Sequence, residues 1–305
     1  MSIPVPKPSL DQPVPRIAFV TTCKGRLHHL KETLPLLVSM GPEQIIVVDY
    51  GCPDGTGEWV RKTHPEVTLV SVSDDPGFCA SRARNLGAGA ASTEWICFID
   101  ADIRVDPAWL DWIRGNLQSG HFYRAAKIQG VRQKETWGTV ICQKTAFQQI
   151  SGYDEVFRGW GGEDDDLYFR LVENADQLES AYPAHFISAI SHDDEERTKF
   201  HQEKNKELQM VVNRYYRNTK HFLMGDSRME LPASIRESLM LQISDGVKRA
   251  FEKEQPHPVR DFKPTVRAVL NFQAGLDERC LKIGYRRRYV IFGPKSFSVT
   301  ERRIK

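Results

Sequence analysis

Residues 95–102 read WICFIDAD, five apolar residues followed by two aspartates on either side of one alanine. A short apolar run of this kind indicates a buried strand, here ending near Ile99. In extended backbone, residues i and i+2 point to the same side, so we expect the carboxylates of Asp100 and Asp102 to converge. Carboxylates are hard oxygen ligands for Mg²⁺ or Mn²⁺. The pair therefore indicates either a metal site or a solvated acidic turn.

Strand-like and helix-like segments alternate on the N-terminal side of this run. We expect strands at 16–22, 44–49 and 67–72, and between them helices around 27–37, 59–60 and 81–91. This alternation predicts an α/β fold, a mostly parallel central sheet with helices on both faces. Ligands of such sheets bind beyond the carboxyl ends of the strands, which is where Asp49 and Asp100 fall.

The pattern loosens after residue 106. We expect helices from residue 109 and at 145–150, 167–174, 195–222 and 232–254, with a strand-like run at 139–142 and another apolar run at 184–191. Residues 256–264 resemble a linker, and the remainder is either a strand pair or an irregular tail. The predicted organisation is a disordered tail at 1–15, an α/β domain at 16–222, and a helical extension with a basic tail at 223–305.

Composition limits the partners of the chain. Its 305 residues carry a formal charge of only +2, which predicts no nucleic-acid partner. The arginines at 286–288 and 302–303 form either a solvated face or a peripheral contact with an anionic surface. We expect no signal peptide and no transmembrane segment, because no apolar run approaches roughly 20 residues. The six cysteines match no zinc template and are expected to be reduced thiols, which predicts a cytoplasmic protein.

A second acidic segment, GWGGEDDD, occupies residues 159–166. Four consecutive acids repel one another, although the first turn of a helix favours negative charge. An acidic helical turn is therefore one interpretation. A ligand site is the other, because glycines let the backbone approach a ligand closely and Trp160 offers a flat face to a sugar ring. A carboxylate here would accept a proton from an attacking hydroxyl group.

Polar residues elsewhere indicate a nucleotide and a metal. His192 follows the apolar run FISAIS and is either structural or a metal ligand. Seven polar residues follow strand-like runs or open the helix-like segment at 81–91. They are either loop caps and surface ion pairs, or contacts to a base, ribose and phosphate. These residues are Thr21, Thr22, Lys24, Asp49, Arg82, Arg84 and Asn85. No Gly-x-x-x-x-Gly-Lys-Ser/Thr loop and no Gly-x-Gly-x-x-Gly follow the first strand, which argues against P-loop NTPases and dinucleotide oxidoreductases.

In chain order, VTTCKGR (20–26), VVDYGCPDGT (47–56), ARNLG (83–87) and FIDAD (98–102) resemble the motifs of family 2-type glycosyltransferases of the GT-A fold. GWGGEDDD is similar to the signature of β-1,4-galactosyltransferases and chondroitin-polymerase-type enzymes. The resemblance covers roughly residues 16–215 and implies metal-dependent transfer of a sugar from a nucleotide-sugar. It favours an inverting transfer of a hexose or N-acetylhexosamine from a UDP-sugar to a hydroxyl of a glycan or other acceptor.

The resemblance also implies residue roles. Asp102 and His192 would bind Mn²⁺ or Mg²⁺, and Asp164 would be the catalytic base. Trp160, Glu163 and Asp165 would hold the acceptor. The implied contacts to the nucleotide-sugar are Thr21, Thr22, Lys24, Asp49, Arg82, Asn85, Asp100 and Ala101.

One departure and three rivals stay open. Ala189 stands where the galactosyltransferases carry a methionine ligand. Retaining N-acetylgalactosaminyltransferases share Trp-Gly-Gly-Glu but lack the triple aspartate. The rivals are a retaining transferase, a nucleotidyltransferase, which usually needs a glycine-rich basic loop after the first strand, and a noncatalytic sugar-binding module.

Overall fold

The computed structural model describes residues 14–191, 194–225, 230–253, 265–272, 275–288 and 296–303. Side-chain contacts are described only for residues up to 253. The chain divides into two compact units. The first consists of Met1–Glu155 and Glu163–Gln202, and the second of Val156–Gly162 and Glu203–Lys305. The short segment Val156–Gly162 thus leaves the first unit and joins the second before the chain returns.

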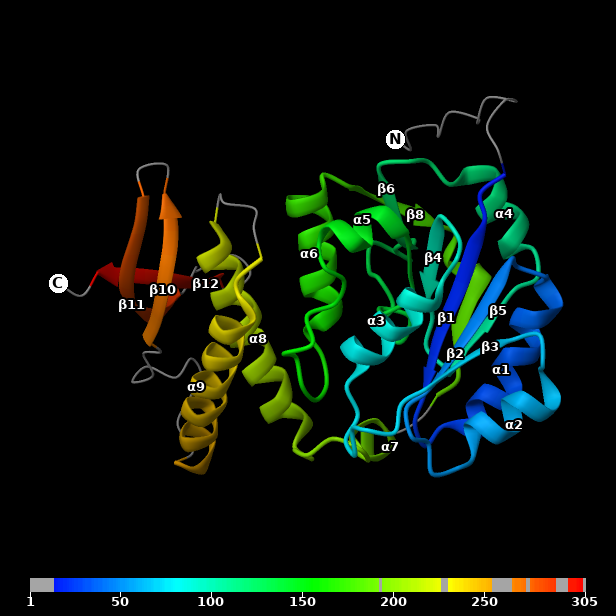
Figure 1. The fold of residues 1–305 in the computed structure, drawn as a ribbon, viewed down its shortest axis with the longest axis horizontal. Coiled ribbons are helices and arrows are strands. Elements are labelled where there is room, and N and C mark those ends of the chain that lie inside the picture. Colours follow the sequence, from blue (N-terminus) through cyan, green and yellow to red (C-terminus); the bar gives the residue numbers. More distant parts are fainter. Residues whose placement is uncertain are drawn as a thin grey trace. The chain divides into compact units, whose positions relative to one another are not determined.

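A seven-stranded sheet forms the centre of the first unit, in the order β3-β2-β1-β4-β7-β6-β8 (Figure 1). Its strands are β1 (Ile17–Cys23), β2 (Gln44–Asp49), β3 (Thr68–Ser71), β4 (Trp95–Phe98), β6 (His121–Ala125), β7 (Val140–Gln143) and β8 (Leu178–Tyr182). The first four in the order are parallel, β7 runs antiparallel to β4 and β6, and β8 is parallel to β6. The expected strands are confirmed, and the sheet is mostly parallel on the β3–β4 side.

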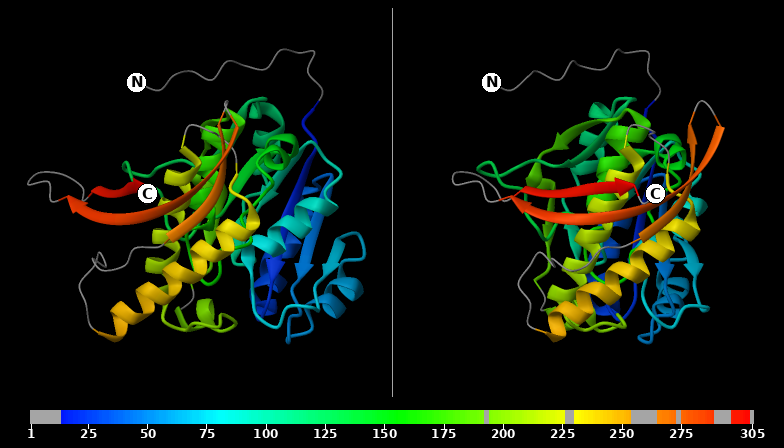
Figure 2. Two further views of the ribbon diagram at one scale, coloured as in Figure 1. Left: turned by 60° about the vertical axis from the view of Figure 1, so that its left-hand side comes forward. Right: turned by 90° about the vertical axis from the view of Figure 1, so that its left-hand side faces the viewer.

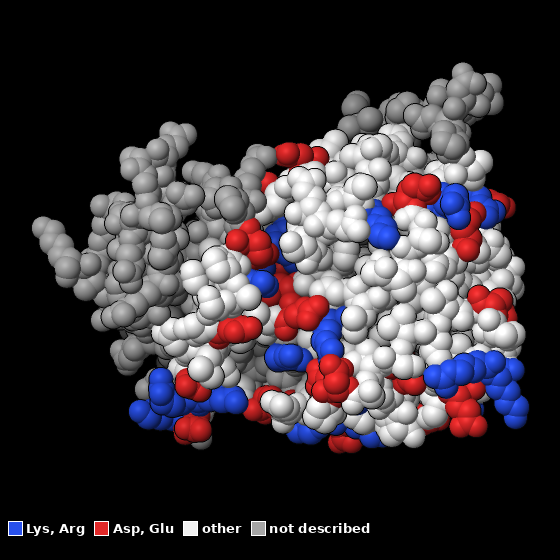
Figure 3. Space-filling view, viewed as in Figure 1, with Lys and Arg blue, Asp and Glu red and all other residues white. Residues whose placement is uncertain are grey.

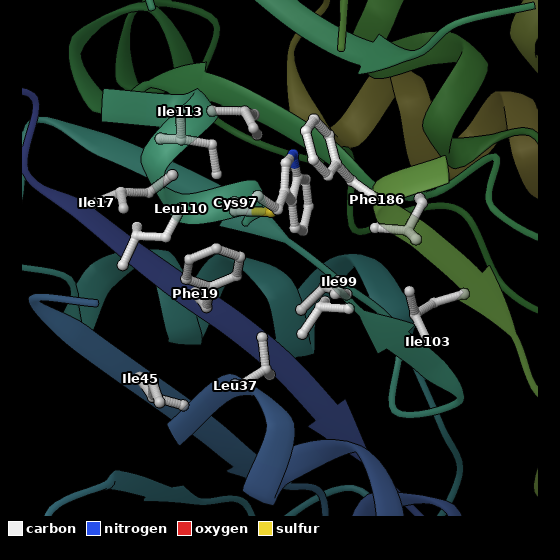
Figure 4. Packing of buried hydrophobic residues seen from close by; sticks show 14 of the residues in the cluster. Ile17, Phe19, Leu37, Ile45, Cys97, Ile99, Ile103, Leu110, Ile113 and Phe186 are labelled. Atoms are coloured by element: carbon white, nitrogen blue, oxygen red, sulfur yellow. The ribbon is translucent and has the colours of Figure 1, made fainter. Parts of the chain in front are cut away.

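Helices cover both faces of this sheet, because the strands alternate between two apolar faces. On one face lie α1 (Leu27–Met40), α2 (Thr56–Thr63) and α4 (Trp109–Asn116), and on the other α3 (Ala80–Ala90), α5 (Lys144–Gln149) and α6 (Glu163–Ala175) (Figure 2). Phe19 of β1 packs with Leu37 of α1 and Leu110 of α4 (Figure 4). Burial from two sides leaves only the strand ends available for a site.

A small second sheet brings a distant segment to the end of β4. The strand β5 (Ile103–Val105) pairs antiparallel with β9 (Ile187–Ala189), which follows the 3₁₀ helix η1 (Ala184–Phe186). The N–H of Ile190 donates to the carbonyl of Asp102 at 2.8 Å. The short helix α7 (Asp194–Thr198) comes next in the chain.

In the second unit, α8 (Lys206–Met224) and α9 (Ala233–Glu252) pack around one apolar cluster that includes Phe157, Tyr216 and Ile243. The strands β10 (Thr265–Phe272), β11 (Gly275–Arg288) and β12 (Ser296–Arg303) form an antiparallel sheet. The helix expected at 195–222 is therefore wrong as one element. Asn205 begins α8 as its N-cap, since its side chain accepts the Leu208 N–H at 3.0 Å.

The tail is three strands where the sequence offered a strand pair or an irregular tail. The predicted domain limits stay predictions, although residue 222 lies inside α8 and the compact units divide at 202/203. The linker at 256–264 lies outside the described residues. No helix within the described ranges is both long and apolar enough to cross a membrane. The cytoplasmic location stays a prediction. Acidic and basic side chains are interspersed on the face seen in Figure 3.

Candidate active site

Arg84 of α3 is the centre of a charged cluster at the carboxyl end of β4. Its guanidinium donates to Asp100 Oδ1 at 2.9 Å, to Asp164 Oδ1 at 3.0 Å and to Glu163 Oε1 at 3.4 Å. The Arg84 side chain is only 6% exposed. The fold therefore gathers carboxylates from the end of β4 and the first turn of α6 around one buried cation.

The four consecutive acids of α6 point to different partners. Asp164 accepts a second hydrogen bond from Tyr153 Oη at 3.4 Å, and Asp165 accepts one from Trp137 Nε1 at 3.0 Å. Asp166 is fully buried and pairs with Arg170 at 2.7 Å. That last pair is structural, because Arg170 also donates to two backbone carbonyls that precede α6. Of the four acids, three are therefore left to take part in the cluster: Glu163, Asp164 and Asp165.

Gly138 leaves room beside this cluster. A Cβ at this position would lie 3.0 Å from Arg84 Nη2, 3.1 Å from Asp100 Oδ2 and 3.2 Å from Asp164 Oδ2. These distances are shorter than ordinary contacts, so a side chain here would press on all three groups. The glycine keeps the space next to the carboxylates open.

Burial and charge shift the protonation of the cluster. Burial, followed by the charge of Asp164, raises the pKa of Glu163 to about 8. Burial also raises the pKa of Asp164, while Arg84 acts in the opposite direction. One cation faces three carboxylates, which leaves an excess of negative charge suited to a proton or a metal cation. A carboxylate whose pKa approaches neutrality is an effective general base.

The backbone of the DAD segment is not extended, contrary to what the sequence argument had assumed. Residues 101–102 form a turn, and the Ile103 N–H donates to the Asp100 carbonyl at 3.1 Å. The alternation of extended backbone is therefore lost. Asp100 pairs with Arg84, whereas the mostly buried Asp102 pairs with Arg26 Nη1 at 3.4 Å. The argument from extended backbone therefore does not apply, and the convergence of the two carboxylates stays a prediction.

The residues after β1 form the expected nucleotide end only in part. Thr21 is 1% exposed, inside the strand, and Thr22 is partly exposed. Lys24 Nζ donates to the Pro76 carbonyl at 3.2 Å and lies 5.6 Å from the Tyr50 ring centroid. Lys24 therefore joins the loop after β1 to the segment that follows β3.

Three other residues that were expected to contact the nucleotide-sugar instead form hydrogen bonds within the protein. Both carboxylate oxygens of Asp49 accept N–H groups, one from Cys52 in the following loop and one from Gly57 in the first turn of α2. Asn85 exchanges hydrogen bonds with the Tyr153 backbone and donates to Glu155. Ala101 is buried, and its carbonyl accepts the Thr33 hydroxyl at 2.7 Å. Contacts of these residues to a nucleotide-sugar stay predictions.

Arg82 lies two residues before Arg84 in α3, but its side chain has different partners. Its guanidinium donates to the exposed Asp74 at 2.7 Å and to Tyr50 Oη at 3.4 Å. The Tyr50 hydroxyl donates to Asp75 Oδ2 at 2.7 Å. Of the two arginines, Arg84 is the one in contact with the acids of DAD and EDDD.

The GWGG loop belongs to the second unit, where α8 holds it. Trp160 N–H donates to the side chain of Gln209, and Asn213 Nδ2 donates to the Gly161 carbonyl at 2.7 Å. A Cβ on Gly159 would lie 2.3 Å from Gln209 Oε1, and its φ of +77° also favours glycine. The glycines thus serve close approach to α8. Lys206 Nζ lies 4.2 Å from the Trp160 ring centroid.

His192 lies outside the described residues, so its role as a metal ligand stays a prediction. The sequence argument missed Trp137, Gly138 and Tyr153 as cluster residues. The signal available was a tryptophan–glycine pair shortly before an apolar strand. The sequence alone does not show that this pair lies near the acids, because that depends on the pairing of β7 with β4.

Cys52 is a half-buried thiol in the loop that follows β2. A hydrogen bond from the Cys23 thiol is the largest cause that lowers the pKa of Cys52 to about 5, and the Gly25 N–H donates to Cys52 Sγ at 3.0 Å. The hydrogen bond to Cys52, followed by burial, raises the pKa of Cys23, and burial raises the pKa of Cys97 and Cys142.

We expect iodoacetamide to modify Cys52 before the other described cysteines. Its rate should change little across neutral pH, because the thiol is already ionised. An ordinary thiol should react about 50-fold faster at a pH of about 8.5 than at about 6.5. Timed alkylation with peptide mapping measures each site, and an ordinary pH dependence at Cys52 would contradict the prediction.

Two glycosyltransferase family models match the chain. The model for glycosyl transferase family 2 matches residues 19–141, and the model for the N-terminal domain of galactosyltransferase matches residues 121–193. A pre-mycofactocin glycosyltransferase of Mycobacterium tuberculosis is 24% identical over 178 residues, which cover 47% of this chain and 37% of the relative. This chain therefore spans little more than a third of that relative's length.

The solved structure of the mannosyltransferase PcManGT from Pyrobaculum calidifontis, in complex with GDP-Man and Mn²⁺, has the same fold. It aligns with 80% of this chain and 77% of its own, with a TM-score of 0.51 and 15% sequence identity. This likeness shows the fold alone. Taken together, the GT-A fold and the two family models matching residues 19–193 support a glycosyltransferase.

Proposed function

We propose that the chain is an inverting, metal-dependent glycosyltransferase. It would move a hexose or N-acetylhexosamine from a UDP-sugar to a hydroxyl group of a glycan or other acceptor. The observation that carries this proposal is the placement of Asp164 against Arg84 and Tyr153, beside Asp100 at the end of β4. An acidic side chain from α6 thus lies next to the strand end where open α/β sheets bind ligands.

Asp164 is the proposed base. Its carboxylate takes the proton of the acceptor hydroxyl as that oxygen forms a bond to the anomeric carbon. The bond from the anomeric carbon to the diphosphate oxygen breaks, and the nucleoside diphosphate leaves with the electron pair. Arg84 and Tyr153 fix the orientation of Asp164, and burial raises the pKa of Asp164, which makes its carboxylate a stronger base.

Asp102 and His192 are the proposed ligands of Mn²⁺ or Mg²⁺. The residues present fit a divalent cation, because Asp100, Glu163 and Asp164 share a single buried arginine and Asp102 follows the same strand. Ile190, two residues before His192 in sequence, hydrogen-bonds to the Asp102 backbone. When bound, the ion would stabilise negative charge on the leaving diphosphate.

The acceptor and donor contacts complete the proposal. Asp165, held by Trp137, and Glu163 would bind acceptor hydroxyls, and Trp160 would face the sugars. The partly exposed Thr22 and the residues Lys24 and Arg82, which surround Tyr50, would meet the nucleotide. Asp49 would contribute indirectly, because its hydrogen bonds hold the segment between β2 and α2.

A thermal-shift screen of UDP- and GDP-sugars, each with and without Mn²⁺, tests the proposal. A donor at about 100 times its Kd stabilises the folded state by about 2.7 kcal/mol. We therefore expect a rise in Tm with a UDP-sugar and Mn²⁺ together, and slow metal-dependent release of UDP. A rise without any UDP release would favour a noncatalytic binding module. No rise with any donor and Mn²⁺ would remove the proposed function.

A further inference from the structure

Two adjacent histidines and a glutamate from separate helices of the first unit meet at one point. His28 and His29 lie in the first turn of α1, and Glu196 lies in α7. His28 Nε2 lies 3.2 Å from Glu196 Oε1, and His29 Nδ1 lies 3.8 Å from the same oxygen. One ligand atom from each of the three residues lies within 4.8 Å of the others.

These spacings match the ligand shell of a tetrahedral ion. Bonds of about 2.1 Å to nitrogen and oxygen place the ligand atoms of a tetrahedral Zn²⁺ about 3.4 Å apart. The two distances to Glu196 bracket that value. His29 is 7% exposed in its side chain whereas His28 is 61% exposed, so the cluster has one buried wall and one side open to solvent. An ion can enter from that side, and water can complete its shell.

We propose that His28, His29 and Glu196 bind a transition-metal ion, with zinc as the ion that suits two imidazoles and one carboxylate best. Imidazole nitrogens select Zn²⁺, Ni²⁺ or Cu²⁺, whereas sites made mainly of carboxylates suit Mg²⁺ and Mn²⁺. This site uses other residues than the one proposed at Asp102 and His192, although the charge of Asp102 also acts on His29. It does not depend on the proposed transferase activity.

The bound ion would fasten the segment 194–201 to the loop and helix that follow β1. That segment already packs against the loop after β1 and against Phe78, which precedes α3. A Cβ on Gly25 would lie 2.1 Å from the Phe200 ring, and His201 stacks on Phe78 with ring centroids 6.3 Å apart. Glu196 adds a third point of attachment, at the first turn of α1. The metal would convert this weak polar contact into coordinate bonds.

Isothermal titration of the full chain with ZnCl₂, after removal of any histidine tag, tests the site. We expect His28→Ala and Glu196→Gln each to bind one zinc fewer per chain than the unmodified protein. His64→Ala is the matched control, because His64 Nδ1 lies 3.2 Å from Glu66 Oε1 without a second imidazole. It should bind as much zinc as the unmodified protein. Equal stoichiometry in all four proteins would overturn the proposal.

Trypsin cleavage after the exposed Lys199 gives an independent measurement. Zinc should slow this cleavage about fivefold or more in the unmodified protein, because binding stabilises the closed segment by mass action. It should have no effect in His28→Ala, whose substituted side chain is exposed and whose fold is checked by circular dichroism. Equal slowing in both proteins would also reject the site.

Discussion

Asp164→Asn should lower sugar transfer by about 10²- to 10⁴-fold, the usual contribution of a general base. Asparagine has nearly the same shape but accepts no proton at neutral pH. Donor binding should persist, because Asp102 and the residues after β1 are unchanged. The Tm should not fall, since burial already disfavours the charged form of Asp164 and Arg84 keeps Asp100 and Glu163. UDP release with acceptor, and the thermal shift with UDP-sugar and Mn²⁺, measure the two effects.

Glu173→Gln is the control for that experiment. Glu173 lies in the same helix, is exposed, and is far along α6 from the cluster in sequence. It should transfer sugar at the rate of the unmodified protein. Near-normal transfer by Asp164→Asn would show that another group removes the acceptor proton. Loss of both transfer and donor binding would show that Asp164 holds the site together instead.

Arg84→Met should have the largest effect on stability. Methionine keeps an unbranched side chain but removes the buried charge that faces Asp100, Glu163 and Asp164. Removing one partner of a buried ion pair costs about 3–5 kcal/mol in the free energy of unfolding, because the remaining charges stay buried and uncompensated. Urea unfolding at several pH values measures the loss.

The pH dependence identifies the cause. Burial raises the pKa of Glu163 to about 8 and also raises that of Asp164, and Arg84 opposes both shifts. Without Arg84 the folded state holds more protons than the unfolded state over a wider range, so stability falls as pH rises. The deficit of Arg84→Met should therefore be largest above a pH of about 8 and smaller near about 5. A deficit independent of pH would point to lost packing.

Arg82→Met provides the comparison for stability. It removes an arginine of the same helix whose partner Asp74 is 67% exposed in its side chain. Solvent screens such pairs, so the urea midpoint should stay close to that of the unmodified protein. A loss equal to that of Arg84→Met would mean that any arginine of α3 supports the helix, and that the buried cluster has no special role.

The strands β1, β2 and β4 could be predicted from the sequence, because each is a short apolar run buried on two faces. Runs such as 16–22 and 44–49 carry that signal within a few residues. The strands β6 and β8 do not, since HFYRA and LESAY mix polar and apolar residues. Their pairing depends on β7, which inserts antiparallel between β4 and β6. Such long-range register has no local signature.

The candidate site shows the same limit. The acids of EDDD and the aspartate pair were recognisable as chemistry-bearing residues, but their partners were not. Whether an aspartate meets Arg84, Trp137 or Arg170 depends on which face of α6 it occupies and on what packs there. The turn at Asp100–Asp102 is likewise set by its own hydrogen bond, which overrides the extended pattern of the preceding strand.

The route of the chain through Val156–Gly162 has a practical consequence for anyone who shortens this protein. A fragment that stops at residue 202 would keep every strand of the seven-stranded sheet. It would lack Gln209 and Asn213, which hold the glycine loop, and the aromatic wall around Phe157. The smallest useful expression fragment therefore has to extend through α9, whether or not it also includes β10, β11 and β12.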